Sequence, residues 1–168
     1  LECGNIVKIK KILLAYGIKD QLPEIEGIKN LWGHSVVHCP YCHGFEFQDK
    51  PLALLGDGEI AIHLLSLLLG LSNDIILFTN GSSTLTKEQK EKILLQNIKI
   101  IETPVAKLEH TLKDLDSVVL DNGESISRKA LFVVPKFPFI KSSNIGQEIG
   151  CKIDNLRSEE RRVGKECR

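Results

Sequence analysis

The segment from Pro51 to Gly70 places the tightest limits on how this chain can fold. An apolar stretch, Pro51–Leu55, runs directly into the turn Gly56-Asp57-Gly58, and an apolar, helix-length stretch, Glu59–Leu69, follows before Gly70. This order predicts a buried strand, a tight turn and a largely buried helix that a glycine ends. A strand, a glycine turn and a helix in direct succession are typical of α/β folds.

Further strands and a helix follow in the same alternating order. Asp74–Thr79 predicts a second strand, apolar enough to be buried on both faces. Lys87–Gln96 predicts an amphipathic helix, because Thr86 and Gln89 have the spacing of a capping box. Ile98–Ile101 predicts a third strand. The resulting βαβαβ order predicts a doubly wound parallel sheet, a Rossmann-like nucleotide-binding domain.

The flanking segments have weaker patterns. Lys11–Ala15 is a short apolar run that predicts a buried strand, and Gln21–Gly33 has little periodicity and predicts a linker. After Ala106, the pair Asn122-Gly123 predicts a tight hairpin turn. The short runs around it, including Ala130–Val134, predict a small antiparallel meander.

Charge and hydropathy exclude several classes of protein. Lys plus Arg and Asp plus Glu both number 22, so no basic surface for nucleic acid is expected. The longest apolar run is too short to span a bilayer, and no signal peptide opens the chain. We therefore expect a cytoplasmic protein with neither a nucleic-acid nor a membrane partner. The segment Arg157–Arg168 resembles a translated sequencing adapter, and Met is absent, so we expect an internal gene fragment with an artefactual tail.

The motif His-Cys-Pro-Tyr-Cys-His-Gly at residues 38–44 allows three interpretations. A structural zinc site needs a second ligand pair, which is not found, and a covalent haem site needs an axial partner, for which only another histidine is present. The dithiol interpretation is favoured, because C-x-x-C beside a βαβ unit is typical of redox motifs. Cys39 and Cys42 would then open and close a disulfide, and His43 could stabilise a thiolate or carry its proton. A non-catalytic zinc- or haem-binding module remains the alternative.

The glycine turn matches the pattern G-x-G-x-x-A of dinucleotide-binding sites. Gly56 would make the tight turn, Gly58 would let the backbone approach a pyrophosphate, and Ala61 would let the helix pack on the strand. An acidic residue about 20 positions later would favour NAD, and an Arg would favour NADP. Thr79 and Asn80 stand there instead, so the motif predicts a nucleotide without choosing between the two.

Several motifs together carry a specific family resemblance. They are KILLAYG at 11–17, LPEIEG at 22–27, LWG at 31–33, HCPYCHG at 38–44, LLGDGEIA at 54–61 and LFTNG at 77–81. In their order and spacing the chain resembles the thioredoxin reductase-like FAD-dependent pyridine nucleotide-disulfide oxidoreductases. The resemblance implies an FAD domain interrupted by a nicotinamide domain. Residues 1–33 would end the first FAD-domain segment and form a linker, 34–135 the NAD(P)-binding domain, 136–156 the return to a truncated FAD domain, and 157–168 the tail.

The resemblance also implies an activity. FAD and NADP, or NAD, would be the cofactors, and electrons would pass from the nicotinamide through flavin to the Cys39/Cys42 pair. Cys42 would lie against the flavin, and Cys39 would exchange with a thioredoxin-like protein or a small-molecule disulfide. His43 stands where the family carries an acidic proton donor. Gly56, Gly58 and Ala61, with Thr79 and Asn80, would hold the nicotinamide coenzyme.

Further expectations follow from the same family. The full-length protein would be a homodimer, and its domains would rotate about hinges at 21–33 and 135–138. Tyr16 departs from the family's usual Thr, and the family's basic cluster for the NADPH phosphate is absent after Thr79. A dithiol oxidase that uses FAD and oxygen is therefore the alternative enzyme. We expect the fragment alone to hold FAD poorly or not at all.

Overall fold

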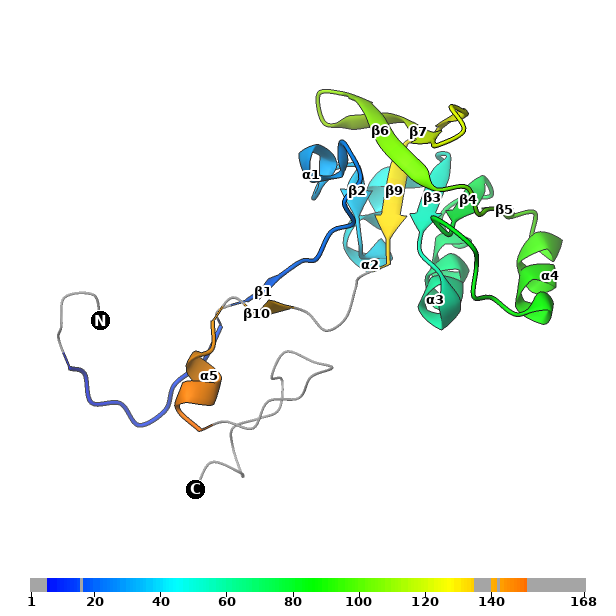
Figure 1. The fold of residues 1–168 in the computed structure, drawn as a ribbon. Helices are drawn as coiled ribbons and strands as arrows, with labels where there is room; N and C mark the ends of the chain where they lie inside the picture. Colours follow the sequence, from blue (N-terminus) through cyan, green and yellow to red (C-terminus); the bar gives the residue numbers. More distant parts are fainter. Residues whose placement is uncertain (1–5, 16, 135–139, 142, 151–168) are drawn as a thin grey trace. The chain divides into compact units, whose positions relative to one another are not determined.

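A computed structural model describes residues 6–15, 17–134, 140–141 and 143–150. The chain divides into two compact units, Leu22–Pro135 and Leu1–Gln21 with Lys136–Arg168 (Figure 1). The larger unit contains all of the motifs from LPEIEG to LFTNG. In the described parts of the chain, no helix is both long enough and apolar enough to cross a membrane.

A five-stranded parallel sheet forms the centre of the larger unit. Its strand order is β2-β9-β3-β4-β5, and every neighbouring pair is parallel. The strands are β2 (Val36–Val37), β3 (Leu52–Leu55), β4 (Ile75–Phe78), β5 (Lys99–Ile101) and β9 (Ala130–Val133). The α/β class and the parallel sheet predicted from the sequence are confirmed.

The helices of this unit follow the predicted positions closely. The strand–turn–helix unit continues into α3 (Gly58–Leu68), and α4 (Lys87–Leu95) follows β4. At the start of α4, the Thr86 side chain accepts from the Gln89 backbone while the Gln89 side chain accepts from the Thr86 backbone, which is the predicted capping box. Shorter elements precede β3, namely α1 (Ile28–Leu31), α2 (Pro40–His43) and the 3₁₀ turn η1 (Gly44–Phe47).

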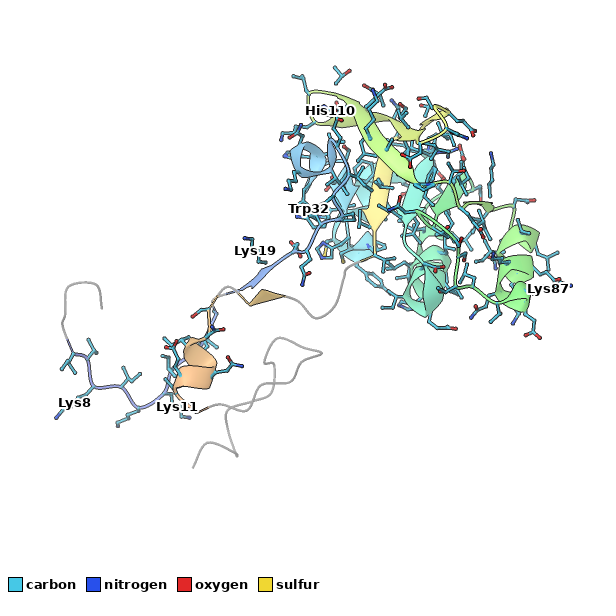
Figure 2. The ribbon with its side chains drawn as sticks, in the orientation of Figure 1. Lys8, Lys11, Lys19, Trp32, Lys87 and His110 are labelled. Carbon is cyan, nitrogen blue, oxygen red and sulfur yellow. The ribbon has the colours of Figure 1, made fainter. Side chains whose placement is uncertain are left out.

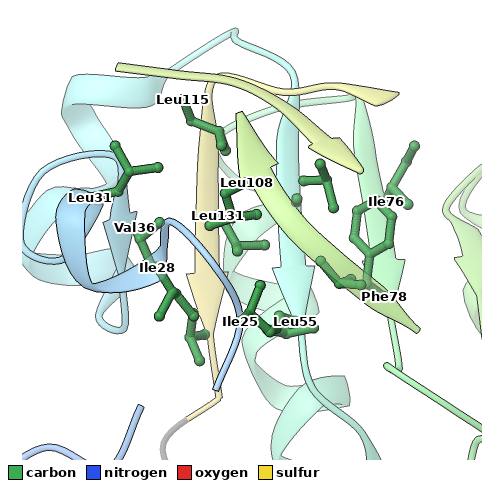
Figure 3. Close-up of a cluster of buried hydrophobic side chains, with 14 of the residues drawn as sticks. Ile25, Ile28, Leu31, Val36, Leu55, Ile76, Phe78, Leu108, Leu115 and Leu131 are labelled. Atoms are coloured by element: carbon green, nitrogen blue, oxygen red, sulfur yellow. The ribbon is translucent and has the colours of Figure 1, made fainter. Parts of the chain in front are cut away.

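The parallel sheet is buried on both faces. In β3, Leu52 and Leu54 pack into one hydrophobic cluster with α3 and α4, while Ala53 and Leu55 pack into the other. Alternate residues of β4 and β9 divide in the same way, because successive side chains of a strand point to opposite faces. The second cluster, shown in Figure 3, is closed by α1 and by a separate small sheet. The larger unit therefore has three layers.

The small sheet is antiparallel and has the order β6-β7-β8. Its strands are β6 (Val105–Thr111), β7 (Asp114–Leu120) and β8 (Ser125–Ser127). The β7–β8 hairpin forms at the predicted pair, with Gly123 at a φ of 84°, but Asn122 does not have the positive φ that was expected of both residues. The inclusion of Ala130–Val134 in this meander was wrong, because β9 leaves it and pairs in parallel between β2 and β3. That pairing joins strands distant in the chain, which local patterns do not reveal.

The expected linker at 21–33 differs from the observed structure. Ile28 and Leu31 of α1 are fully buried, and Ile25 is nearly so, within the cluster of Figure 3. Gly27 precedes α1 with a φ of 88° and lies against the Leu108 backbone of β6. Residues 22–33 therefore belong to the core of the larger unit. Their apolar positions are too few and too widely spaced for a periodic signal.

In the described residues of the smaller unit there are three short elements. β1 (Ile18–Lys19) pairs antiparallel with β10 (Ile140–Lys141), and α5 (Ile145–Glu148) follows. The strand predicted at Lys11–Ala15 is not formed, and most of its side chains are exposed. An apolar run becomes a strand only beside a partner strand, and no described strand lies beside this one. Tyr16, the expected hinge at 135–138 and the tail at 157–168 lie outside the described residues.

Arg128 gives a first testable prediction. Its side chain, only 10% exposed, pairs through Nη1 with the Asp74 carboxylate and joins the loop before β9 to the loop before β4. Arg128→Met is expected to lower the free energy of unfolding by about 1–2 kcal/mol, because the ion pair with Asp74 is lost. The loss stays modest since the Asp74 carboxylate remains hydrated without its partner. Urea denaturation followed by circular dichroism measures this. Lys87→Met, at an exposed i,i+4 pair with a separation of 4.0 Å, is the control and should cause no measurable loss. Equal losses in the two variants would contradict the prediction.

Candidate functional site

The two cysteines of the redox motif lie at the start of α2. Cys39 is the N-cap residue, and Pro40 occupies the first helical turn, where its missing N–H costs no hydrogen bond. The backbone amides of Cys42 and His43 both donate to the Cys39 carbonyl at 3.2 Å. This single turn brings the sulfurs together, and the Cys42 thiol donates to Cys39 Sγ at 2.9 Å. The chain thus holds two free thiols at a separation from which a disulfide can close.

The two thiols are not equivalent. Cys42 is exposed and Cys39 is partly buried. The hydrogen bond to Cys39 raises the pKa of the Cys42 thiol above its ordinary value, and partial loss of solvent and the charge of Cys39 act in the same direction. Cys42 therefore holds its proton more firmly than an ordinary thiol does, and Cys39 Sγ is the acceptor of its hydrogen bond.

The histidines around the motif have separate partners. His43 Nδ1 lies 3.6 Å from the Glu46 carboxylate, and the imidazole is about one-third exposed. The His38 ring stacks on Trp32, with ring centroids 5.8 Å apart and an interplanar angle of 23° (Trp32 is labelled in Figure 2). Within the described residues, the His43 imidazole thus pairs with Glu46 rather than with either sulfur. Its role in proton transfer stays a prediction.

Two aromatic side chains beside the cysteines were missed from the sequence. Tyr41 is 82% exposed and Phe45 is 85% exposed. They lie four residues apart and flank Cys42. Their spacing was visible in the sequence, but their exposure depends on which face of α2 and η1 packs on the core.

The glycine turn has the geometry that the nucleotide-binding pattern requires. A Cβ on Gly56 would lie 2.1 Å from Val134 Cγ2, so only glycine fits where β3 leaves the sheet. Gly58 has a φ of 72°, and the nearest atom to an added Cβ would be Thr84 Oγ1 at 3.8 Å, so its backbone is open to approach. Ala61, in the first turn of α3, is fully buried in the cluster that contains Leu52 and Leu54 of β3. These three residues fit a dinucleotide whose pyrophosphate lies at the start of the helix.

Asp57, between the two glycines, reaches across to the loop that follows β4. Its carboxylate accepts hydrogen bonds from Ser83 Oγ at 2.9 Å and from the Thr84 backbone amide at 2.7 Å. Partial burial raises the pKa of Asp57, but the hydrogen bonds from Thr84 and Ser83 outweigh it and hold the pKa below its usual value. The carboxylate is therefore ionised at neutral pH. Sequence reasoning missed this residue, although an acidic residue inside G-x-G was a visible signal.

The predicted cofactor residues Thr79 and Asn80 hold the loop in shape. Thr79 Oγ1 donates to the Gly81 carbonyl at 2.6 Å. Asn80 has a φ of 55°, and its Oδ1 accepts from the Val105 amide at 2.8 Å. Their role in binding a coenzyme stays a prediction. In the described part of the chain, no group of three or more His, Cys, Asp or Glu side chains is placed to hold a metal ion.

Comparisons with known proteins agree on one group of enzymes. No family model matches the chain. It is 29% identical over 153 residues to the thioredoxin reductase aclD of Aspergillus oryzae, a match that covers 84% of this chain and 49% of that protein. Among solved structures, it matches a putative thioredoxin reductase TrxB of Bacillus anthracis with a TM-score of 0.75 and 27% identity, covering 82% of this chain and 46% of the other. It matches the structure of HlmI with a TM-score of 0.73 and 33% identity, covering 82% and 42%. The chain thus spans less than half the length of these proteins.

Proposed function

We propose that this chain, whose relatives and structural neighbours are thioredoxin reductase-like oxidoreductases, carries the redox-active cysteine pair and the nicotinamide-binding unit of a flavin-dependent disulfide oxidoreductase. The observation that carries the proposal is the hydrogen bond of 2.9 Å between the two sulfurs of C-x-x-C at the start of α2. The glycine turn beside β3 supports it, because its three small residues fit a dinucleotide.

The proximity of the two sulfurs sets the order of the chemistry. Cys39, as a thiolate, attacks one sulfur of an external disulfide. That S–S bond breaks, the other external sulfur leaves as a thiolate, and a mixed disulfide with Cys39 forms. Cys42 then gives its proton to His43, which pairs with Glu46, and attacks Cys39 Sγ. The external sulfur held on Cys39 leaves and takes that proton, so the products are the Cys39–Cys42 disulfide, one external thiolate and one external thiol. The external disulfide has gained two electrons, and Cys39 and Cys42 have lost two.

The cofactors are proposed from the family. When bound, FAD would supply or collect the electron pair of the cysteines, and the nicotinamide coenzyme would supply a hydride. Gly56, Gly58 and Ala61 would hold the coenzyme's pyrophosphate. A thioredoxin-like or small disulfide partner, a homodimer and a cytoplasmic location stay predictions.

A second candidate function, a dithiol oxidase that uses FAD and oxygen, runs the same cysteine chemistry in reverse. The observation that favours it is the charge around the glycine turn. Residues 79–86 contain no Lys or Arg, while Asp57 and Glu59 place two carboxylates beside the turn. In the full-length protein, fast bleaching of the flavin by NADH or NADPH in a stopped-flow experiment supports the reductase. Oxygen-dependent dithiol oxidation without such bleaching supports the oxidase.

A redox titration tests the shared part of both functions. The full chain is equilibrated in dithiothreitol buffers of graded potential, and mass spectrometry counts the free thiols at Cys39 and Cys42. We expect both thiols to disappear together in one two-electron transition. Thiols that stay free in every buffer, with a bound metal in elemental analysis, would overturn the proposal and favour the metal-binding alternative.

The order of thiol labelling is a separate prediction. A short pulse of iodoacetamide at neutral pH is expected to label the partly buried Cys39 before the more exposed Cys42, because the raised pKa of Cys42 leaves less of the reactive thiolate. The labelling rate of Cys42 should approach that of Cys39 only once the pH exceeds the ordinary thiol pKa, since the pKa of Cys42 is raised. Tandem mass spectrometry of the peptide that contains both residues measures the ratio. If Cys42 is labelled first at neutral pH, exposure rather than protonation controls reactivity.

A further inference from the structure

We propose that Asp57 sets the coenzyme preference of the nucleotide site, so that it accepts the free ribose of an NADH-type nucleotide and rejects the 2′-phosphate of NADPH. The inference rests on the proposed nicotinamide-binding function. It places the residue that selects between NADH and NADPH in the glycine turn itself, whereas in this fold that residue usually lies about 20 positions later in the chain.

The position of the Asp57 carboxylate is the first support. In a doubly wound sheet, the loop after the second strand of the unit faces the ribose of the adenosine half. Here that loop follows β4, and Asp57 bonds directly to its residues Ser83 and Thr84. The side chain therefore bridges the glycine turn, where the pyrophosphate would lie, and the loop at the ribose.

The charge of this carboxylate is the second support. Partial burial raises the pKa of Asp57, but hydrogen bonds from Thr84, Ser83 and the Gly58 backbone hold that pKa below its usual value, so the carboxylate is ionised at neutral pH. A carboxylate accepts a hydrogen bond from a ribose hydroxyl, whereas a 2′-phosphate is largely a dianion at neutral pH and would meet a like charge.

The charges nearby add to this discrimination. Glu59, at the start of α3, accepts a hydrogen bond from Gln89 and is a second carboxylate beside the turn. Lys87, labelled in Figure 2 on α4, lies 4.0 Å from Glu91, and Lys90 pairs with Glu102. A 2′-phosphate adds about −1.5 to −2 charges. In the described loop it would find no Lys or Arg to balance them.

The test compares two small probes that differ only in the 2′-phosphate. The full chain is titrated with 5′-AMP and with 2′,5′-ADP by isothermal calorimetry, for the native sequence and for Asp57→Asn. The native chain is expected to bind 5′-AMP at least about tenfold more tightly than 2′,5′-ADP. In Asp57→Asn, the ratio of the two dissociation constants is expected to approach one, mainly because 2′,5′-ADP binds more tightly. Asn keeps an acceptor for Ser83 or Thr84, and circular dichroism checks that the variant is folded.

Asp121→Asn is the matched control, because it removes the same charge at an exposed turn of the small sheet. It should leave the ratio unchanged. If the native chain and Asp57→Asn discriminate equally, Asp57 does not set the preference, although the nucleotide site stands. If neither protein binds either probe, the nucleotide site and the inference both fail. The redox titration of Cys39 and Cys42 would still report separately on the disulfide chemistry.

Discussion

Cys42→Ser is expected to trap the chain as a stable mixed disulfide on Cys39, whereas the native chain is expected to close the Cys39–Cys42 disulfide and keep no adduct. In the variant, Cys39 keeps its place at the N-cap of α2 and can still attack an external disulfide. No second thiol then resolves the product. In the native chain, Cys42 Sγ lies 2.9 Å from Cys39 Sγ and can resolve it. This contrast is the largest effect that the site geometry predicts.

The experiment uses 5,5′-dithiobis(2-nitrobenzoate) at neutral pH. For Cys42→Ser we expect a stable adduct on Cys39 in the intact-peptide mass. For the native chain we expect the Cys39–Cys42 disulfide with no retained adduct. Other cysteines of the chain react in all variants alike, so only the peptide containing residues 39 and 42 is compared. A retained adduct on Cys39 in the native chain, or no stable adduct on Cys39 in Cys42→Ser, would contradict the proposed roles.

Gly27→Ala is expected to destabilise the larger unit by about 2–5 kcal/mol. Two independent costs add at this position. The backbone has a φ of 88°, which costs an L-residue with a side chain about 1–2 kcal/mol. The added Cβ would also lie 2.6 Å from the Leu108 carbonyl oxygen, and backbone of a paired strand cannot move aside cheaply. The loss would separate α1 from β6 and open the core shown in Figure 3.

Gly33→Ala provides the matched control on the other side of α1. Its φ of 79° is similar, but no atom lies within 4 Å of an added Cβ. Only the backbone cost of about 1–2 kcal/mol applies there. Urea denaturation of both variants separates strain from steric overlap. Equal destabilisation would show that α1 shifts freely against β6, contrary to the packing described.

The parts of the fold that the sequence predicted are those decided by neighbouring residues. β3, the glycine turn and α3 follow one another without a break, and the Thr86–Gln89 capping box lies within one helical turn. β9 was assigned to the wrong sheet because its partners, β2 and β3, lie far away in the chain. The sequence predicts a linker at 21–33 because the burial of Ile25, Ile28 and Leu31 depends on distant contacts, among them those with Leu108 of β6.

The features of the candidate site also separate into those set by local sequence and those set by tertiary contacts. The sequence by itself determined that two thiols two residues apart can join, and that Gly56, Gly58 and Ala61 can make a nucleotide turn, because both follow from local spacing and side-chain size. Only the tertiary structure decided that the Cys42 thiol donates to Cys39 Sγ, which raises the pKa of Cys42, and that Asp57 reaches Ser83 and Thr84. A proton's position depends on distance and on solvent around both sulfurs. A bond across 26 residues exists only once β3 and β4 lie side by side, and no pattern within a short stretch of sequence contains that information.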